Sequence, residues 1–241
     1  MPKKRKHSSS RLFLTQRDKK IFQFLFEHRL ATLKDIEERF FPAKNTRDVQ
    51  KRLKKLREAR LIGRDQSINL SCGFFYFLLP RGLKNLYPQG RFLEGIRLKG
   101  PNIEHDYTLI KVRKILEQAR FIHRYYTENM TTSDLFFPES SDIFGDDRSF
   151  RPDAVFVTMN DKGPLFNALE LEVQQKDKKR YREKIQKYYF NEKIDYVFLI
   201  FSSESIRKAV MNMEKFLYPK GNTKFLYGHL GNLLEKNFHL S

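Results

Sequence analysis

Two segments, Arg151-Pro152-Asp153 and Glu170-Leu171-Glu172, decide the fold of the second half of this 241-residue chain. Each acidic residue lies within or beside an otherwise apolar run of the kind that forms buried β-strands. Burying three carboxylates so close together costs much free energy unless positive charge lies among them. A divalent metal ion would supply that charge, because Mg²⁺ and Mn²⁺ bind carboxylate oxygens. The pattern therefore predicts a metal site formed by Asp153, Glu170 and Glu172.

The two segments are predicted to lie on neighbouring strands. The alternation of a strand over Leu165–Val173 puts both glutamates on one face, and Gln174 continues that face. Asp153 lies near the start of a strand predicted over Phe150–Met159, where the preceding proline is tolerated. The turn Asn160-Asp161-Lys162-Gly163 joins the two strands, so we expect them to be antiparallel.

The elements around these strands follow the order helix, three strands, helix, strand. Residues 128–149, rich in Ser and Asp, are expected to form a loop beside the site. The predicted elements are helices at Ile103–Ala119 and Lys178–Phe190, strands at Phe121–Thr127, Phe150–Met159, Leu165–Val173 and Tyr196–Phe201, then a helix, a short strand near Lys224–Tyr227 and a terminal helix.

The formal net charge of +18 is concentrated in the first part of the chain. Residues 1–100 contain 25 Lys and Arg against 9 Asp and Glu, a net of +16, whereas residues 101–241 contain 22 against 20, a net of +2. Such a split predicts a basic module that binds a polyanion, followed by a nearly neutral module with another task. Nucleic acid is the expected partner.

Three helices and a β-hairpin are predicted between residues 11 and 80. Thr15-Gln16-Arg17-Asp18 and Thr32-Leu33-Lys34-Asp35 both have the capping-box pattern that begins a helix. A third helix is predicted from about residue 45 or 46 to residue 59, and two strand-like runs follow at Gln66–Leu70 and Phe74–Leu79. This order predicts a winged helix-turn-helix, in which the hairpin is the wing.

The third helix has two contrasting faces. Apolar residues recur at helical spacing on one side and predict that it is buried. The opposite side carries five polar residues, Arg47, Gln50, Lys51, Lys54 and Lys55. Arg and Gln suit base edges and Lys suits phosphates, so this helix is predicted to bind double-stranded DNA. A solvated lysine-rich face is the alternative interpretation.

These patterns predict a two-domain protein of mixed α+β and α/β class. The expected segments are a basic disordered arm at 1–10, a winged helix-turn-helix domain at 11–80, a linker at 81–101 and an αβββαβ domain at 102–241. Cys72 is the single cysteine, which fits a reducing, cytoplasmic setting. No apolar run is long enough for a membrane span, so no membrane partner is expected.

The order of the second half resembles the PD-(D/E)xK nuclease fold. Pro152-Asp153 matches the PD element, and Glu170-Leu171-Glu172 matches (D/E)xK with glutamate in place of the lysine. The resemblance implies that Asp153, Glu170 and Glu172 bind Mg²⁺ or Mn²⁺ and take part in catalysis. It implies that a lysine from beyond the strand completes the set: Lys176, Lys179 or Lys184, of which Lys184 lies where a helix face looks back to the strand ends. Glu104 resembles an accessory acid of the first helix, and Gln174 and Lys176 are the other implied accessory residues.

The chain as a whole resembles a narrower family, the replication-relaxation proteins of plasmids and mobile elements. The resemblance covers nearly all of the chain and rests on four short motifs: Glu104-His105-Asp106, Arg151-Pro152-Asp153-Ala154, Glu170-Leu171-Glu172 and Tyr181…Lys184…Tyr188. It implies an N-terminal winged helix followed by a degenerate nuclease-like domain. It extends to the MobC group of mobilisation relaxases, which are thought to nick a transfer origin by metal-dependent chemistry.

Two functions are therefore expected to compete. The first is a metal-dependent DNA endonuclease or nickase acting at a transfer or replication origin, with water as the nucleophile or, alternatively, Tyr181, Tyr188 or Tyr189. The second is a catalytically inactive DNA-binding regulator of replication or transcription. The missing lysine at position 172 favours the second function, and the three retained acids favour the first. Other mobilisation or replication proteins and a second copy of the chain are further expected partners.

Overall fold

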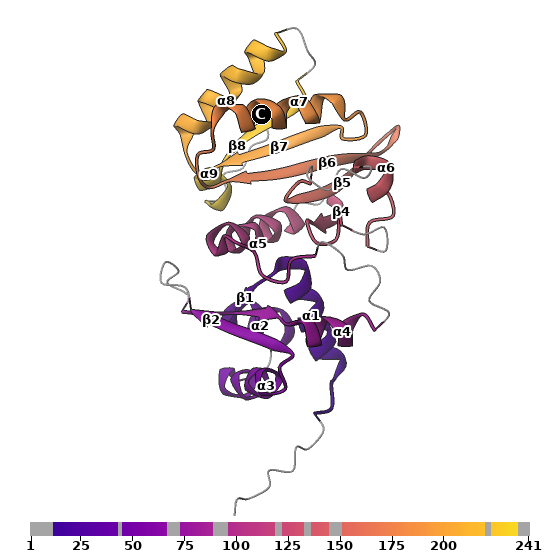
Figure 1. Ribbon diagram of the computed structural model, residues 1–241, viewed down its shortest axis with the longest axis vertical. Coiled ribbons are helices and arrows are strands. Elements are labelled where there is room, and N and C mark those ends of the chain that lie inside the picture. Colours follow the sequence, from indigo (N-terminus) through magenta and orange to yellow (C-terminus); the bar gives the residue numbers. More distant parts are fainter. Residues whose placement is uncertain are drawn as a thin grey trace, which may run out of the picture. The chain divides into compact units, whose positions relative to one another are not determined.

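The computed structural model describes residues 12–42, 45–66, 73–88, 96–118, 122–132, 136–144, 151–219 and 223–235 (Figure 1). The chain is a mixed α/β protein that divides into two compact units, residues 1–90 and 91–241, each with its own sheet. No helix in the described part of the chain is long and apolar enough to cross a membrane. The arm predicted at residues 1–10 lies outside the described residues.

Unit 1 contains the three predicted helices and a three-stranded antiparallel sheet of order β1-β3-β2. Both predicted capping boxes are present, at Thr15 with Asp18 and at Thr32 with Asp35. The elements are α1 (Gln16–His28), β1 (Ala31–Thr32), α2 (Leu33–Phe40), α3 (Thr46–Glu58), β2 (Ile62–Gln66), β3 (Phe74–Leu78) and α4 (Pro80–Leu86).

The core of unit 1 forms where the helices pack on the sheet. α3 turns Val49, Leu53 and Leu56 inward, as its periodicity predicts, and all three are buried. A buried ion pair also joins two helices: the Arg52 guanidinium of α3 donates to the Asp18 carboxylate of α1. One of the cations on α3 is therefore part of the framework of the unit.

The hairpin of unit 1 is present, but its first strand begins earlier than predicted. β2 ends at Gln66, where the predicted strand would begin, and the rest of that prediction lies outside the described residues. Ile62 is buried and pairs with Leu78, so apolar contact holds the strand at this end. Gly63 lies beneath the ring of Phe77, and a Cβ there would come within 2.3 Å of it. The strand is thus placed by packing against β3.

The connection predicted at residues 81–101 contains a helix that the sequence did not indicate. α4 begins with Pro80 at its first position, which suits proline because that N–H has no helical partner. Leu83 of α4 is buried, and the Tyr87 hydroxyl hydrogen bonds with Gln23 of α1. Residues 80–87 therefore pack with unit 1, and the two units divide after residue 90.

Unit 2 has the predicted element order around a five-stranded sheet, β4-β5-β6-β7-β8. The first three strands are antiparallel, and β6, β7 and β8 are parallel. The short helix α6 lies in the segment that was predicted to be a loop. The elements are α5 (Ile103–Gln118), β4 (Ile122–Thr127), α6 (Ser140–Phe144), β5 (Ala154–Asn160), β6 (Gly163–Glu172), α7 (Lys178–Phe190), β7 (Tyr196–Phe201), α8 (Glu204–Leu217), β8 (Phe225–His229) and α9 (Leu230–Leu234).

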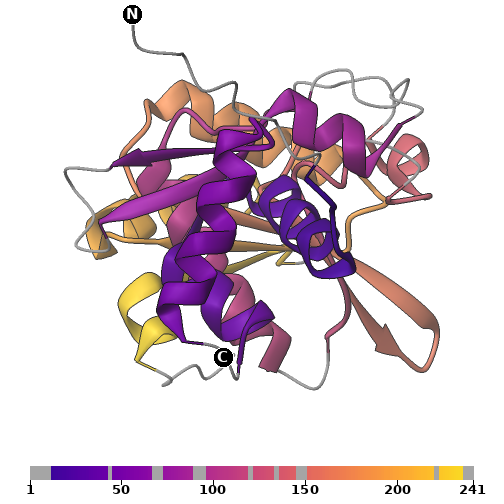
Figure 2. The same ribbon diagram turned by 90° about the horizontal axis from the view of Figure 1, so that it is seen from below.

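The sheet of unit 2 is covered on both faces. Residues of α6, α7 and α8 pack on one face, and residues of α5 and α9 pack on the other. Successive residues of β6 alternate between the two cores: Ala168 faces α7, whereas Leu169 and Leu171 face α5. The tip of the β5–β6 hairpin, around residues 160–163, extends past its neighbouring strands in Figure 2. The opposite ends of these two strands carry the three acids predicted from the sequence, Asp153, Glu170 and Glu172.

Candidate functional site

The three predicted carboxylates lie where β5 begins and β6 ends, and we refer to Asp153, Glu170 and Glu172 as the acidic centre. Asp153 immediately precedes β5, and the two glutamates are the last alternate residues of β6. Both glutamates are buried, with exposed fractions of 5% and 0%. Their side chains contact residues of α7 and of the segment before it, so they share one face of the sheet as predicted.

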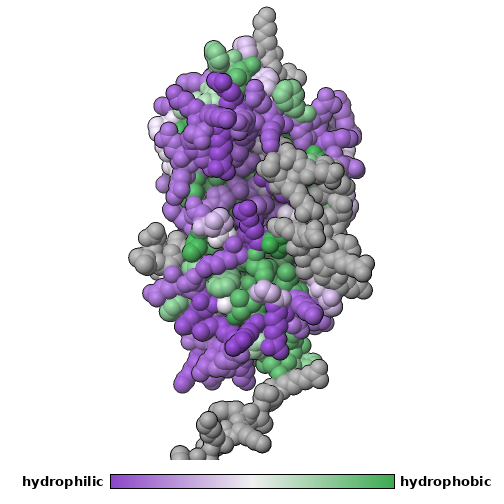
Figure 3. Space-filling view, viewed as in Figure 1, coloured by the Kyte–Doolittle hydropathy of each residue, from purple (hydrophilic) through white to green (hydrophobic). Residues whose placement is uncertain are grey.

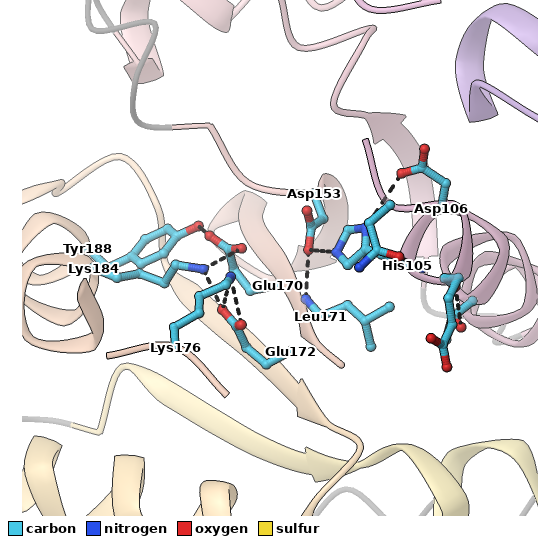
Figure 4. A network of polar contacts seen from close by, with 12 residues as sticks. His105, Asp106, Asp153, Glu170, Leu171, Glu172, Lys176, Lys184 and Tyr188 are labelled. Carbon is cyan, nitrogen blue, oxygen red and sulfur yellow. Dashed lines mark hydrogen bonds and ion pairs between the residues drawn. The ribbon is translucent and has the colours of Figure 1, made fainter. Parts of the chain in front are cut away.

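Two lysines and a tyrosine hold the glutamates (Figure 4). Lys184 Nζ lies 2.8 Å from Glu170 Oε2 and 2.8 Å from Glu172 Oε1. Lys176 Nζ also donates to Glu172 Oε1, at 2.8 Å, and the Tyr188 hydroxyl donates to Glu170 Oε1, at 2.7 Å. Charge-assisted hydrogen bonds of this length compensate much of the cost of burying the two carboxylates.

Asp153 is held from the other face of the sheet. The Leu171 N–H donates to its Oδ2 at 2.8 Å; Asp153 lies one residue before, and Leu171 two residues after, the last residue pair of β5 and β6, Ala154 with Leu169. The same oxygen lies 3.2 Å from Nε2 of His105 in α5. Arg151, two residues earlier, donates from its guanidinium to the Thr131 carbonyl at 2.8 Å. The Asp153 side chain thus accepts the Leu171 N–H in place of a backbone carbonyl, just after Pro152 and before β5 begins. Through His105 it also links α5 to the sheet.

The contact between His105 and Asp153 is an ion pair at neutral pH. Burial by itself would lower the pKa of His105, but hydrogen bonds to Asp106 and Asp153 outweigh it and raise the pKa to about 10. Burial would likewise raise the pKa of Asp153, but the hydrogen bond and the charge of His105 hold it below its usual value. A protonated imidazole therefore faces an ionised carboxylate.

Lys184, which lies between Glu170 and Glu172, is also charged at neutral pH. Burial would lower the pKa of Lys184, but the nearby charges of Glu170 and Glu172 exceed that effect and raise it. Burial raises the pKa of Glu170, against the opposing charge of Lys184. Lys184 is therefore an ammonium donor placed between the two carboxylates of β6.

This arrangement does not fit a divalent cation as it stands. Within the described ranges, no group of three or more His, Cys, Asp or Glu side chains is arranged to hold a metal ion. The glutamate oxygens accept hydrogen bonds from Lys176, Lys184 and Tyr188. These donor groups occupy the space beside the oxygens that a metal ion would need. The positive charge that the sequence pattern assigned to a metal is supplied by the fold itself.

The predicted accessory residues have different positions. Lys176 contacts the acidic centre. Glu104 is exposed, and its neighbour His105 makes the contact with Asp153 instead. Gln174 is exposed beyond the end of β6, and Lys179 is exposed and lies 3.9 Å from Glu183. Of the three candidate lysines, Lys176 and Lys184 therefore reach the carboxylates.

The three candidate tyrosine nucleophiles are packing residues that form hydrogen bonds. Tyr188 is fully buried against Glu170, and the Tyr181 hydroxyl accepts the Lys176 N–H at 3.2 Å. Tyr189 donates to the buried Glu214 at 2.7 Å. Burial raises the pKa of each of these hydroxyls. A raised pKa lowers the fraction of phenolate, the nucleophilic form of tyrosine, at neutral pH.

Sequence reasoning did not assign a role to His105 or Tyr188 in the acidic centre. Both residues occur in the motifs that carry the family resemblance, but their partners, Asp153 and Glu170, are 48 and 18 residues away. The usable signal was the run Glu104-His105-Asp106 at the start of a predicted helix, where a histidine lies between two acids. The contact of this histidine, His105, with Asp153 depends on how α5 packs on the sheet.

The second candidate site is the outer face of α3. All five predicted residues, Arg47, Gln50, Lys51, Lys54 and Lys55, are exposed. The ion pairs of this face are long and exposed: Lys51 lies 3.7 Å from Asp48, and Lys54 lies 3.9 Å from Glu58. Exposed ion pairs of this kind are weak, so these lysines remain available to an external partner. The face therefore presents positive charge to solvent and to any polyanion that approaches it.

Comparison with known proteins agrees with the resemblance read from the sequence motifs. The model of the replication-relaxation family matches residues 22–191, which include α3, the acidic centre and the whole of α7. Searches of curated proteins and of solved structures found no significant match. Because the family model matches well over half of the chain, the chain belongs to the replication-relaxation family.

Proposed function

We propose that this protein binds double-stranded DNA through α3 and acts in the replication or mobilisation of a plasmid or other mobile element. The observation that carries the proposal is the exposed cationic face of α3, opposite its three buried apolar residues. The order of α1, α2, α3 and the β2–β3 hairpin supports a winged helix, whose third helix enters the major groove. Membership of the replication-relaxation family supports the biological setting.

The DNA-binding proposal is tested with a double variant of the α3 face. Arg47→Ala with Lys51→Ala removes two exposed cations without touching the core. In fluorescence anisotropy with a labelled duplex, we expect affinity to fall about tenfold or more. The slope of log K against log salt should become shallower by up to about 1.8, since each lost phosphate contact removes about 0.9.

The matched control removes two exposed lysines from other helices of unit 1. Lys20→Ala with Lys84→Ala changes the charge equally, on α1 and α4. Binding by this variant should stay within about twofold of the wild type. Equal losses in the two double variants would show that only net charge matters and would refute α3 as the contact surface.

For unit 2, we propose a nuclease-like PD-(D/E)xK framework whose acidic centre is closed by internal ion pairs. The element order α5, β4, β5, β6, α7, β7 supports that framework. The lysines on Glu170 and Glu172 favour the non-catalytic alternative, in which the centre stabilises a DNA-binding regulator. In this state the centre neutralises its own charge and needs no metal ion.

A second candidate function, the metal-dependent endonuclease or nickase, is favoured by one observation. Lys184 Nζ lies 2.8 Å from Glu170, where the resemblance places a catalytic lysine that has moved to the helix. Cleavage would require Asp153, Glu170 and Glu172 to exchange their histidine and lysine partners for Mg²⁺ or Mn²⁺. Those ions would then polarise the phosphate and lower the pKa of a bound water.

Supercoiled plasmid separates the two candidates. The full chain is incubated with plasmid and Mg²⁺ or Mn²⁺, and nicked and linear products are quantified on a gel. The non-catalytic proposal expects no product above a buffer control. Metal-dependent nicking that disappears in Asp153→Asn and Glu170→Gln, at retained folding by circular dichroism, would establish the endonuclease instead.

A further inference from the structure

A dense group of cations lies on the segment that supplies the two lysines of the acidic centre. Residues 176–187 contain seven Lys and Arg against two acids, although residues 101–241 as a whole are nearly neutral. Four of these cations, Lys178, Lys179, Arg180 and Arg182, are exposed at the start of α7. We refer to these four residues as the α7 cationic edge.

The α7 cationic edge has the wrong sign for the stability of its own helix. The N-terminus of a helix carries partial positive charge, so cations there are unfavourable and acids are favourable. Asp177 caps the helix by accepting the Arg180 N–H at 2.8 Å, but the first turn itself contains no acid and three cations follow Asp177 directly. The neighbouring positive charges also repel one another. A partner with negative charge would relieve both effects.

The fold provides little compensation for these charges. The side chain of Lys179 lies 3.9 Å from Glu183, and both are exposed, at 86% and 56%. Among the described residues, Lys178 and Arg182 form no ion pair. By contrast, Lys176 and Lys184, on the same segment, are paired with buried glutamates. Charges that face the sheet are thus neutralised, while those that face solvent are left open.

The position of the edge relates it to the acidic centre. The α7 helix begins six residues after Glu172, and Lys184, one turn beyond Arg180, contacts both glutamates. The face of unit 2 on which α7 and α8 lie is predominantly hydrophilic in Figure 3. A polyanion bound along this edge would pass beside the end of β6 where the centre lies.

We infer that the α7 cationic edge is a second DNA-contact surface, which binds the phosphate backbone of DNA beside the acidic centre. The inference rests on the proposed function, because it assigns a further part of the chain to the same ligand. Flexible lysine and arginine side chains at several successive positions suit phosphates and carry no information about sequence. The α7 edge therefore contributes affinity, whereas the Arg and Gln side chains of α3 can contact bases.

The test is a triple variant at the edge with a matched triple elsewhere in unit 2. Lys178→Gln, Lys179→Gln and Arg182→Gln remove three exposed charges and keep good helix formers. The control, Lys162→Gln, Lys208→Gln and Lys215→Gln, removes three exposed charges from the β5–β6 turn and α8. Binding of the full chain to a labelled duplex is measured between about 50 and 200 mM salt.

The edge variant should lose affinity by on the order of 10²-fold at about 0.1 M salt, with a salt slope shallower by about 2.7, and the control should lose far less. Thermal unfolding should show both variants folded. If the edge and control variants lose affinity equally, the edge is an ordinary solvated face. The second DNA-contact surface is then refuted, while DNA binding through α3 is unaffected. If the wild type shows no binding to the duplex, the proposed function fails, and the inference with it.

Discussion

The outer face of α3 and the acidic centre show how differently one chain can treat concentrated charge. On α3, five polar side chains project into solvent and their ion pairs are long and exposed. In the acidic centre, every carboxylate lies within 3.2 Å of a cation from another part of unit 2. Open charges call for a partner outside the molecule, whereas paired charges do not. Concentrated charge therefore indicates binding in one region and internal stabilisation in the other.

The largest expected effect comes from opening the acidic centre. Lys184→Ala leaves Glu170 and Glu172 buried without their shared ammonium group, and we expect the free energy of unfolding to fall by about 3–5 kcal/mol. Urea denaturation measures the loss, with the exposed Lys179→Ala on the same helix as control. A loss below about 1 kcal/mol would show that these ion pairs contribute little to stability, contrary to the role proposed for the acidic centre.

The same variant can test whether a metal ion is able to replace the lysine. With Lys184 gone, Mn²⁺ at about 1 mM should raise the unfolding temperature if the carboxylates can hold a divalent cation. The wild type, whose carboxylates face lysines, should not respond. A clear response of the wild type would mean that the centre accepts metal as folded.

A smaller effect is expected from the buried pair within the basic unit. Burial would raise the pKa of Asp18, but hydrogen bonds from Arg52 and Thr15 and the charge of Arg52 outweigh it, so the pKa is below 3.8. Asp18→Asn should therefore cost about 2 kcal/mol at neutral pH. Because the folded pKa is depressed, this contribution is complete above about pH 4 and is lost as the pH falls through the folded pKa.

Unfolding measured from pH 7 down to about pH 2 checks the sign of that pH dependence. The stability difference between the wild type and Asp18→Asn should shrink at the acid end, since the wild-type carboxyl becomes protonated. Asp48→Asn, an exposed aspartate on α3, should change stability by no more than about 0.5 kcal/mol. A difference that is constant across the pH range would contradict the assignment to Asp18.

Removing one hydroxyl from the acidic centre should have a moderate effect. Tyr188→Phe deletes the donor to Glu170 Oε1 while keeping the ring in the core, and we expect a loss of about 1–2 kcal/mol. Tyr196→Phe is the matched control, because its ring is 41% exposed. If both variants were equally stable, the tyrosine would contribute packing alone.

The smallest effect on stability should occur on the outer face of α3. Lys54→Ala with Lys55→Ala should leave the free energy of unfolding within about 0.5 kcal/mol, because both side chains are exposed. DNA binding should nevertheless weaken severalfold and become less sensitive to salt. A stability loss without a binding loss would reverse the roles assigned to the two regions.

Most of the element order was predictable because long amphipathic helices and apolar strands leave clear periodic patterns. α7 begins and ends at the predicted residues, Lys178 and Phe190, and both capping boxes of unit 1 were recognised from four residues each. The short helices α4 and α6 were missed, since a helix of seven residues or fewer depends on tertiary contacts. The start of β2 was also predicted too late in the chain, because its position depends on tertiary packing against β3.

The acidic centre was predictable only in part. Strand alternation places Glu170 and Glu172 on one face, and helical geometry singles out Lys184. The contact of His105 with Asp153 depends on how α5 packs on the sheet, which no local pattern encodes. The sequence shows that negative charge is buried, but identifying the cation that neutralises it requires the three-dimensional arrangement.

The hydrogen bond from the Leu171 N–H to Asp153 offers a built-in reporter of motion in unit 2. This amide lies in the central strand, yet its partner is a side chain that is also held by α5. Hydrogen–deuterium exchange at Leu171 would therefore follow the separation of Asp153 from the strand, whereas neighbouring amides with backbone partners follow the opening of the sheet itself. One amide signal can thus record when Asp153, which also contacts α5, separates from β6.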